Sequence, residues 1–267
     1  MWLELREITD RLSHDSAVRV IIFSGAGDRA FTAGLDVSAA ETSLVSIVQD
    51  SSLDGARTAV HLRRLASNFQ DCVSALERCE KPVIAAMHGV SFGLGIDLSV
   101  ATDIRLCAQG TKFSVKEVDI GIAADIGTLT RLPKVVGHYG WVKEVCLTGR
   151  IFGPEEALRV GFVNAVYDDK AKMIAAAVEM AALIASKSPV AVQGTKELLN
   201  YSRDHSVQDG MFHRNRENKP EIKVRLTIYQ IALKYTAVWS ASMMQTKDLP
   251  AAIMSGMQKR TPTFEKL

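Results

Sequence analysis

The 267-residue sequence contains no apolar run that approaches the roughly 18–20 residues of a membrane-spanning helix, so no membrane segment is expected. Cysteines are few: the four present match no zinc-binding or Cys-x-x-Cys spacing, which predicts reduced structural thiols. The histidines are isolated and show no metal-ligand spacing, so no metal site is predicted. A net charge of +2, with scattered Lys and Arg, gives no reason to expect a nucleic-acid partner.

The periodicity of apolar residues predicts alternating helices and strands in the first half of the chain. Helical spacing begins at residues 3–12 and returns at about 60–76, while residues 18–23, 82–89 and 104–108 form short buried-strand patterns. Repeated strand–loop–helix units are typical of an α/β layer structure with mostly parallel pairing. Beyond about Gly140 the strand signal fades, and helices are predicted at 154–161, 171–187 and 189–203.

Residues 211–232 interrupt this helical second half. The segment is abruptly basic, contains Pro220 and carries β-branched residues, which are unfavourable in a helix. An ordinary surface loop is one interpretation, but an insertion into a helical framework is the favoured one, and such a segment is expected to be exposed and mobile.

Two glycine-bearing turns, at residues 30–36 and 89–97, each follow a predicted strand. Glycine lets the backbone turn tightly, and the free N–H groups of a helix N-terminus favour an anion. Two such N–H groups converging on one point would form an oxyanion hole for a polarised thioester carbonyl. Each turn alone is more typical of a plain strand–helix connection. The chain has no G-x-G-x-x-G, so the turns do not favour a dinucleotide site.

Three carboxylates follow the second turn in apolar surroundings: Asp97, Glu117 and Asp125. Apolar burial raises the pKa of a carboxyl into the range that is useful for proton transfer. Each acid alone is more easily explained as structural, but three within about thirty residues favour a site. Asp103 and Asp119 are nearby alternatives that would serve as caps or salt-bridge partners.

Residues 89–93 also match G-x-S-x-G, the pattern of a hydrolase nucleophile elbow. Ser91 is therefore a candidate nucleophile, and an acyl hydrolase is a rival class. His88 is interpreted as a satisfied polar residue at the end of a strand.

Together these segments resemble the crotonase (enoyl-CoA hydratase/isomerase) superfamily. The similarity runs from about residue 3 to 210 and resumes at 233–249, and its clearest blocks are 31–36 (FTAGLD), 81–89 (KPVIAAMHG), 147–150 (LTGR) and 157–164 (ALRVGFVN). The resemblance implies an α/β fold, a crotonase-like spiral of ββα units with a helical C-terminal region. It implies a core at 1–188, shorter at its N-terminus than in the family, and a helical region at 189–267. It also explains the glycine loop and so makes Ser91 a weaker candidate.

The resemblance implies roles for individual residues. The oxyanion hole would use the backbone N–H groups of Leu35 and Leu94. Hydratases of the superfamily carry two catalytic glutamates, and Asp97 stands at the first of these positions, which argues against simple hydration. Residues 113–129 closely resemble the signature of the Δ3,5-Δ2,4-dienoyl-CoA isomerases. Asp125 would then remove the C2 proton of the substrate, Glu117 would protonate C6, and Asp97 would be an orienting or polarising partner.

The same resemblance implies an acyl-CoA substrate, no metal or redox cofactor, and a homotrimer or homohexamer. Residues 265–267 (EKL) match the peroxisomal Ser-Lys-Leu signal at two positions, which favours the peroxisome and leaves the mitochondrion open. The alternatives are an enoyl-CoA isomerase or hydratase of the same superfamily, or an inactive acyl-CoA-binding subunit.

Overall fold

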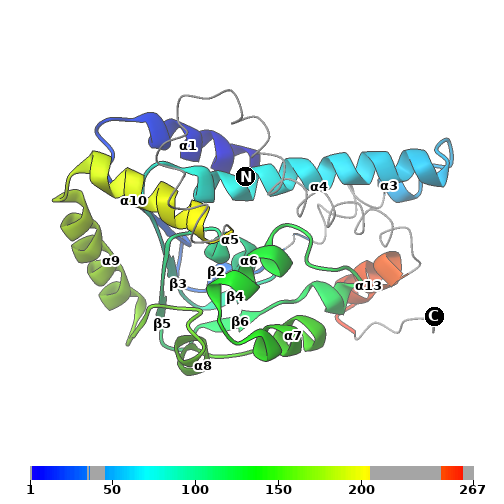
Figure 1. Cartoon of the computed structure of the whole chain (residues 1–267). Coiled ribbons are helices and arrows are strands. Elements are labelled where there is room, and N and C mark those ends of the chain that lie inside the picture. The colour runs from blue at the N-terminus through cyan, green and yellow to red at the C-terminus, as the bar shows by residue number, and fades with distance from the viewer. Residues whose placement is uncertain (1, 35, 37–45, 205–247, 261–267) are drawn as a thin grey trace.

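The computed structural model describes residues 2–34, 36, 46–204 and 248–260 (Figure 1). Its helices are α1 (Trp2–His14), α3 (Ser46–Val48), α4 (Gly55–Arg78), α5 (Leu94–Val100), the 3-10 helix η2 (Glu117–Ile120), α6 (Thr128–Val135), α7 (Tyr139–Thr148), α8 (Pro154–Arg159), α9 (Lys170–Ala185), α10 (Pro189–Ser202) and α13 (Asp248–Met257). Its strands are β1 (Ile21–Ser24), β2 (Ala30–Thr32), β3 (Val83–Met87), β4 (Val90–Phe92), β5 (Ile104–Ala108), β6 (Lys112–Ser114) and β7 (Ala165–Tyr167).

The strands form two parallel sheets, one of order β1-β3-β5-β7 and one of order β2-β4-β6. Strands β1, β3 and β5 enter the first sheet, and the strand that follows each of them enters the second. Helical segments then lead back to the next pair. The chain therefore winds as repeated strand–strand–helix units, and the predicted spiral of ββα units is confirmed.

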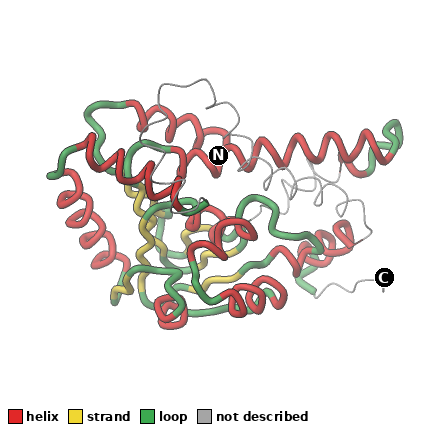
Figure 2. The backbone as a smooth tube through the Cα atoms, viewed as in Figure 1, coloured by secondary structure: helices red, strands yellow, loops and turns green. Residues whose placement is uncertain are grey.

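Apolar packing on both faces of the larger sheet holds this arrangement together. On one face, Ala85 and Met87 of β3 belong to the same buried cluster as Phe113, Phe152 and Phe162, whose ring centroids are 5.3–5.8 Å apart. On the other, Met173 and Ala177 of α9 belong to the same buried cluster as Ile84 and Leu106. Burying each large apolar side chain contributes about 1.5–3 kcal/mol. Figure 2 shows the result, with the strands in the interior and helices around them.

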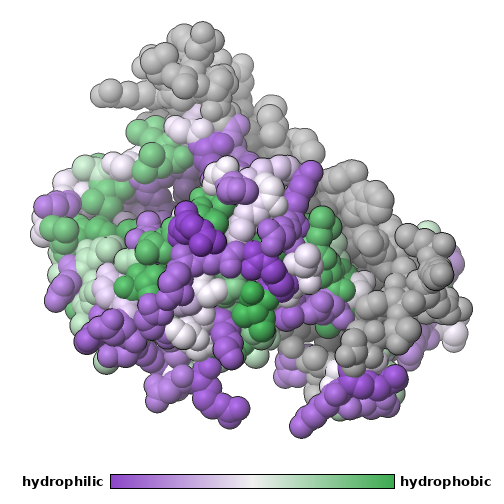
Figure 3. All heavy atoms as spheres, turned by 90° about the horizontal axis from the view of Figure 1, so that it is seen from below, coloured by the Kyte–Doolittle hydropathy of each residue, from purple (hydrophilic) through white to green (hydrophobic). Residues whose placement is uncertain are grey.

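The surface carries apolar residues as well. On the face seen in Figure 3, apolar residues form several separate patches between hydrophilic ones. Within the described residues, no single helix is long and apolar enough to cross a membrane; α9 and α10 meet the test of length and composition only together, and a 108° bend separates them. All four cysteines are free and buried, which confirms the expectation of structural thiols.

The predicted helices and longer strands are confirmed to within a few residues, but the short strands were missed. Strand β7 lies in the half expected to be helical, and β4 lies inside what the sequence indicated as a glycine turn. Both have three residues, too few to show a period of two, and they exist because neighbouring strands supply their hydrogen bonds. The predicted insertion at 211–232 and the tripeptide at 265–267 lie outside the described residues.

Candidate active site

The two glycine turns that the sequence singled out are in contact. Gly34 and Gly93 both have positive φ, +95° and +51°. A Cβ added to Gly34 would lie 3.1 Å from the carbonyl oxygen of Phe92 and 3.9 Å from the Cα of Gly93. A side chain would be strained at either position, and one at Gly34 would also crowd the carbonyl of Phe92, so glycine permits the close approach of the two turns.

Leu94, one of the two predicted oxyanion donors, is the first residue of α5. Its N–H belongs to the first turn of the helix, where no intrahelical carbonyl is in reach. The N-cap is Gly93, which supplies no side-chain cap. The backbone therefore presents a donor at this turn. Leu35, the other predicted donor, lies outside the described residues.

Asp97 lies one turn further along α5 and is 1% exposed. Its Oδ1 accepts two hydrogen bonds from Thr128, one from the backbone N–H and one from the hydroxyl, and each has a donor–acceptor distance of 2.7 Å. Thr128 begins α6, whose N-cap Gly127 has no side chain, so Asp97 caps this helix from outside. Burial raises the pKa of Asp97 to about 6, while the bonds from Thr128 act in the opposite direction.

Glu117 begins η2, and its carboxyl lies beside the second glycine turn: a Cβ on Gly93 would come within 3.1 Å of Glu117 Oε1. Glu117 Oε2 is buried and accepts no hydrogen bond from the described residues. Burial, and next the negative charge of Asp97, raise the pKa of Glu117 to about 8. This carboxyl therefore keeps its proton at neutral pH, as a general acid must.

Asp125 lies in the loop between η2 and α6 and is 4% exposed. Its negative charge contributes to the raised pKa of both Asp97 and Glu117, which places all three carboxyls within electrostatic range of one another. Its backbone carbonyl accepts a 2.6 Å hydrogen bond from the side chain of Gln70 on α4. The fold thus brings together the three acids that the sequence predicted, from a helix, a 3-10 turn and a loop.

The neighbouring acids have other partners. Asp103 accepts from the backbone N–H of Val83 and pairs with Lys196 at 2.7 Å. Asp119 pairs with Lys116 at 2.7 Å across one turn. Both act as caps or ion-pair partners, the alternative roles that the sequence had left open for them.

The hydrolase alternative finds no support in the geometry. Ser91 is fully buried inside β4, opposite Phe113 of β6, and not at an exposed turn between a strand and a helix. His88 donates from Nε2 to the carbonyl of Gly27 at 2.9 Å. Its Nδ1 is buried with no hydrogen-bond partner among the described residues. The expectation that His88 is fully hydrogen-bonded therefore holds for one ring nitrogen and not for the other. An elbow nucleophile needs a histidine partner and an exposed oxygen.

Residues that support the acids were not predicted. Gln70, Thr128 and Arg131 all contact the segment that carries Asp125 or the carboxylate of Asp97. A signal for Gln70 does exist in the sequence: it lies in the buried stripe of α4 that includes Leu62, Ala66 and Val73 at helical spacing. A polar residue in such a stripe needs a buried partner.

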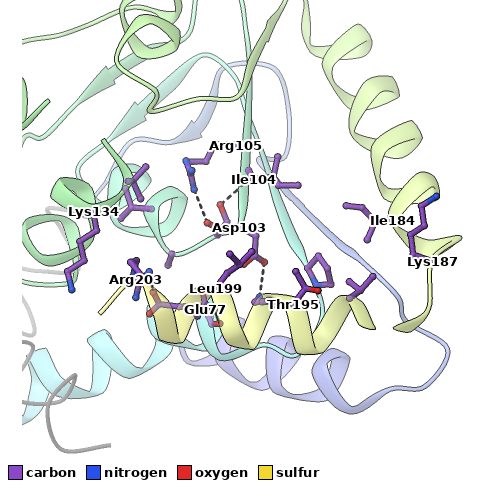
Figure 4. A pocket seen from close by; sticks show the side chains of 18 of the residues that line it. Glu77, Asp103, Ile104, Arg105, Lys134, Ile184, Lys187, Thr195, Leu199 and Arg203 are labelled. Carbon is purple, nitrogen blue, oxygen red and sulfur yellow. Dashed lines mark hydrogen bonds and ion pairs between the residues drawn. The ribbon is translucent and has the colours of Figure 1, made fainter. Parts of the chain in front are cut away.

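A cavity of about 770 Å³ lies elsewhere, between α9 and α10 on one side and the start of β5 on the other (Figure 4). None of the three candidate acids lines it. Several of its charged side chains pair with one another, Lys196 with Asp103 at 2.7 Å and Arg203 with Glu77 at 2.6 Å. Among the described residues, no group of three or more His, Cys, Asp or Glu could hold a metal ion.

Known proteins with similar sequences identify the family of this chain. The family model for enoyl-CoA hydratase/isomerase matches residues 1–223, and the chain belongs to that family. Within it, the chain is 44% identical to the mitochondrial Delta(3,5)-Delta(2,4)-dienoyl-CoA isomerase of Mus musculus, over 100% of this chain and 74% of that protein. It is 38% identical to the peroxisomal protein of the same name from Arabidopsis thaliana, over 100% of this chain and 86% of that protein.

More distant relatives and solved structures share the fold. A crotonyl-CoA hydratase from Syntrophomonas wolfei is 31% identical over 78% of this chain and 74% of that protein. The crystal structure of an enoyl-CoA hydratase from Bacillus anthracis superposes with a TM-score of 0.68 at 26% identity, covering 98% of this chain and 87% of that one. The crotonase fold is therefore shown by sequence and by structure.

Proposed function

We propose that the chain is a Δ3,5-Δ2,4-dienoyl-CoA isomerase. One observation carries the proposal: the buried carboxyl of Glu117 lies against the second glycine turn, from which α5 carries the buried Asp97, and burial with the charges of Asp97 and Asp125 raises the pKa of Glu117 to about 8. The relatives named Delta(3,5)-Delta(2,4)-dienoyl-CoA isomerase support the choice of reaction.

In this mechanism the thioester carbonyl of a 3,5-dienoyl-CoA accepts hydrogen bonds from the N–H groups of Leu35 and Leu94. Polarisation of the carbonyl makes the C2 proton acidic, and Asp125 removes it. The electrons move through the conjugated chain, so the double bonds come to lie at C2 and C4, and C6 takes the proton of Glu117. One proton leaves and one enters, so the step is redox-neutral and we propose that it uses no cofactor.

The protonation states fit this division of roles. A general acid must hold its proton at the working pH, and burial together with the charge of Asp97 gives Glu117 a pKa of about 8. Asp97 accepts two bonds from Thr128, which favour its ionised form and keep the carboxylate in one orientation. We assign to Asp97 the role of an orienting or polarising group.

We further propose a homotrimer or homohexamer. Large apolar side chains are exposed on α7, α9 and α10, including Leu147, Val178, Leu183, Val190 and Leu199. Burying these side chains against a second copy of the chain would stabilise an assembly. Sedimentation analysis tests the assembly.

For the compartment, the relatives are named mitochondrial in mouse and peroxisomal in Arabidopsis. We propose the peroxisome, and imaging of the tagged full-length protein with markers for both organelles tests it.

A spectrophotometric assay of the purified chain with 3,5-dienoyl-CoA tests the reaction, because the conjugation of the product with the thioester changes its absorbance. A 2-enoyl-CoA serves as the control substrate. Isomerisation faster than hydration is expected. Hydration equal to or faster than isomerisation would identify a hydratase, and CoA binding without either reaction would identify a binding subunit.

A further inference from the structure

Arg131 of α6 is 1% exposed and is one of the largest fully buried side chains in the described residues. Its guanidinium donates to Glu77 Oε2 from Nε at 3.2 Å and from Nη2 at 3.0 Å, and Nη2 also donates to the hydroxyl of Ser74 at 2.8 Å. A buried ion pair of this kind adds little to stability compared with apolar packing, because desolvation offsets its attraction. Its position beside the acids therefore calls for a different explanation.

The partners of Arg131 belong to a polar stripe on one buried face of α4. Gln70, Ser74 and Glu77 follow one another at spacings of four and three residues and are 3%, 1% and 9% exposed. Gln70 donates to the backbone carbonyl of Asp125, and the other two hold Arg131. The stripe thus contacts both ends of the short segment that runs from Asp125 to Arg131.

Between these two ends lies Gly127, the N-cap of α6. A Cβ on Gly127 would collide with Nη1 of Arg131, so the guanidinium lies directly against this turn. The backbone N–H of Arg131 also donates to the carbonyl of Gly127 at 2.9 Å. Both the side chain and the backbone N–H of Arg131 therefore contact this turn.

We propose that Arg131 is a positioning residue of the active site: fixed by Glu77 and Ser74, it holds the turn at Gly127 that orients Asp125 and delivers Thr128 to Asp97. The proposal rests on the proposed isomerase function and deepens it. Arg131 touches neither the reacting atoms nor the thioester. It acts through Asp125 before the turn and through Thr128 after it, which donates to Asp97. Its planar guanidinium has a fixed hydrogen-bonding direction that a lysine ammonium lacks.

The charge of Arg131 has a second effect, on Asp97. Burial raises the pKa of Asp97; Thr128 lowers it by hydrogen bonding, Asp125 raises it and Arg131 lowers it through their charges. Among the residues that the structure describes, the other titratable groups facing Asp97 are Glu117 of η2 and Cys146 of α7, whose thiol has a pKa raised to about 11 and stays neutral. Removing the positive charge must therefore raise the pKa of Asp97 further.

Two variants separate geometry from charge. Arg131→Gln removes both the fork and the charge, while Arg131→Lys keeps the charge and loses the fork. The matched control is Lys196→Met, which breaks another buried ion pair, that with Asp103, away from the three acids. Melting temperature, hydrogen–deuterium exchange of residues 124–128, kcat, KM and the pH profile of kcat/KM are measured on the full chain.

In Arg131→Gln, exchange at residues 124–128 is expected to accelerate about tenfold or more because the turn opens locally. The value of kcat should fall roughly 10–100-fold, since moving a catalytic group by about 1 Å costs that much, and KM should stay within about threefold of its value in the unmodified chain. The acidic half-point of the pH profile should move to higher pH, because the proposed polarising role of Asp97 requires its ionised form. Arg131→Lys should lose kcat with its acidic half-point nearly unchanged, and Lys196→Met should lower only the melting temperature.

A merely structural role predicts a different result. Arg131→Gln would then lower the melting temperature as Lys196→Met does, with exchange at 124–128, kcat per folded molecule and the acidic half-point unchanged, and the proposal would be overturned. If Arg131→Gln does not fold, the exchange and kcat of Arg131→Lys decide. If the unmodified chain does not isomerise 3,5-dienoyl-CoA, the proposed function fails, while the exchange measurement still decides whether Arg131 holds the turn.

Discussion

Asp97 and Thr128 are 31 residues apart in the sequence, and both the N–H and the hydroxyl of Thr128 donate to the same oxygen of Asp97, each at a distance of 2.7 Å. A carboxylate at a helix N-terminus interacts favourably with the helix dipole, which stabilises its ionised form. Burial acts against ionisation and raises the pKa of Asp97 to about 6. The balance between the two sets the charge of Asp97 near neutral pH.

Thr128→Val tests this balance, because valine keeps the backbone bond and removes the hydroxyl bond. The pKa of Asp97 should rise, so the acidic half-point of kcat/KM should move up by about 0.5–1 pH unit, the equivalent of one hydrogen bond of about 1 kcal/mol. Thr111→Val is the matched control, since Thr111 is equally buried and donates to Ala108 in the turn between β5 and β6. An unmoved half-point in Thr128→Val would show that Asp97 does not govern the acidic limb.

Asp125→Asn and Glu117→Gln test the division between base and acid. Each should keep the fold and the affinity for CoA and lower turnover by roughly 10²–10⁴-fold, the usual contribution of a positioned acid or base. Without the base, exchange of the C2 protons of the substrate with solvent should stop. Without the acid, exchange can continue while product formation fails.

Deuterium exchange followed by NMR distinguishes these outcomes. Exchange that survives in Asp125→Asn and vanishes in Glu117→Gln would reverse the assignment. Amide variants that lower the melting temperature and leave turnover per folded molecule near normal would make both acids structural.

The raised pKa of Glu117 predicts a dependence of stability on pH. The folded state holds this proton up to about pH 8, whereas an unfolded chain releases it near the ordinary value of 4.5. Between these values the folded state binds more protons, so the contribution of Glu117 to stability falls as the pH rises. Glu117→Gln stays neutral and should avoid this loss.

The melting temperature of Glu117→Gln should therefore exceed that of the unmodified chain at pH 8, by roughly 2–4 °C for each kcal/mol of stability regained, and by less at pH 5. Glu179→Gln, at an exposed position on α9, is the control and should follow the unmodified chain at both pH values. An equal gain at pH 5 and pH 8 would contradict a buried, protonated Glu117.

Gly93→Ala tests the contact between the second glycine turn and the proposed acid. The new Cβ would lie 3.1 Å from Glu117 Oε1, so the carboxyl must move, and kcat should fall about tenfold or more. Gly110→Ala is the matched control, because Gly110 also has a positive φ, +75°, but a Cβ added there would meet no atom within 4 Å. Both variants should lose stability from backbone strain, and only Gly93→Ala should lose turnover per folded molecule. Equal kcat in the two variants would count against Glu117 as the acid.

Local sequence determined much of this protein. The buried strands β3 and β5 and the helices α1, α9 and α10 were predictable because apolar periodicity is a local property. The glycine turns at Gly34 and Gly93 were predictable because positive φ and close approach select glycine. The resemblance to the crotonase superfamily then indicated the three acids by position.

Only the tertiary structure decided the surroundings of those acids. Gln70 reaches Asp125 across 55 residues of sequence, and Arg131 reaches Glu77 across 54. No local pattern encodes such contacts, because they arise when α4 packs against the segment around α6. The same packing removes water from Glu117 and Asp97, and this desolvation is the main cause of their raised pKa values. The sequence supplied the carboxyl groups, and burial by distant parts of the chain set their charge.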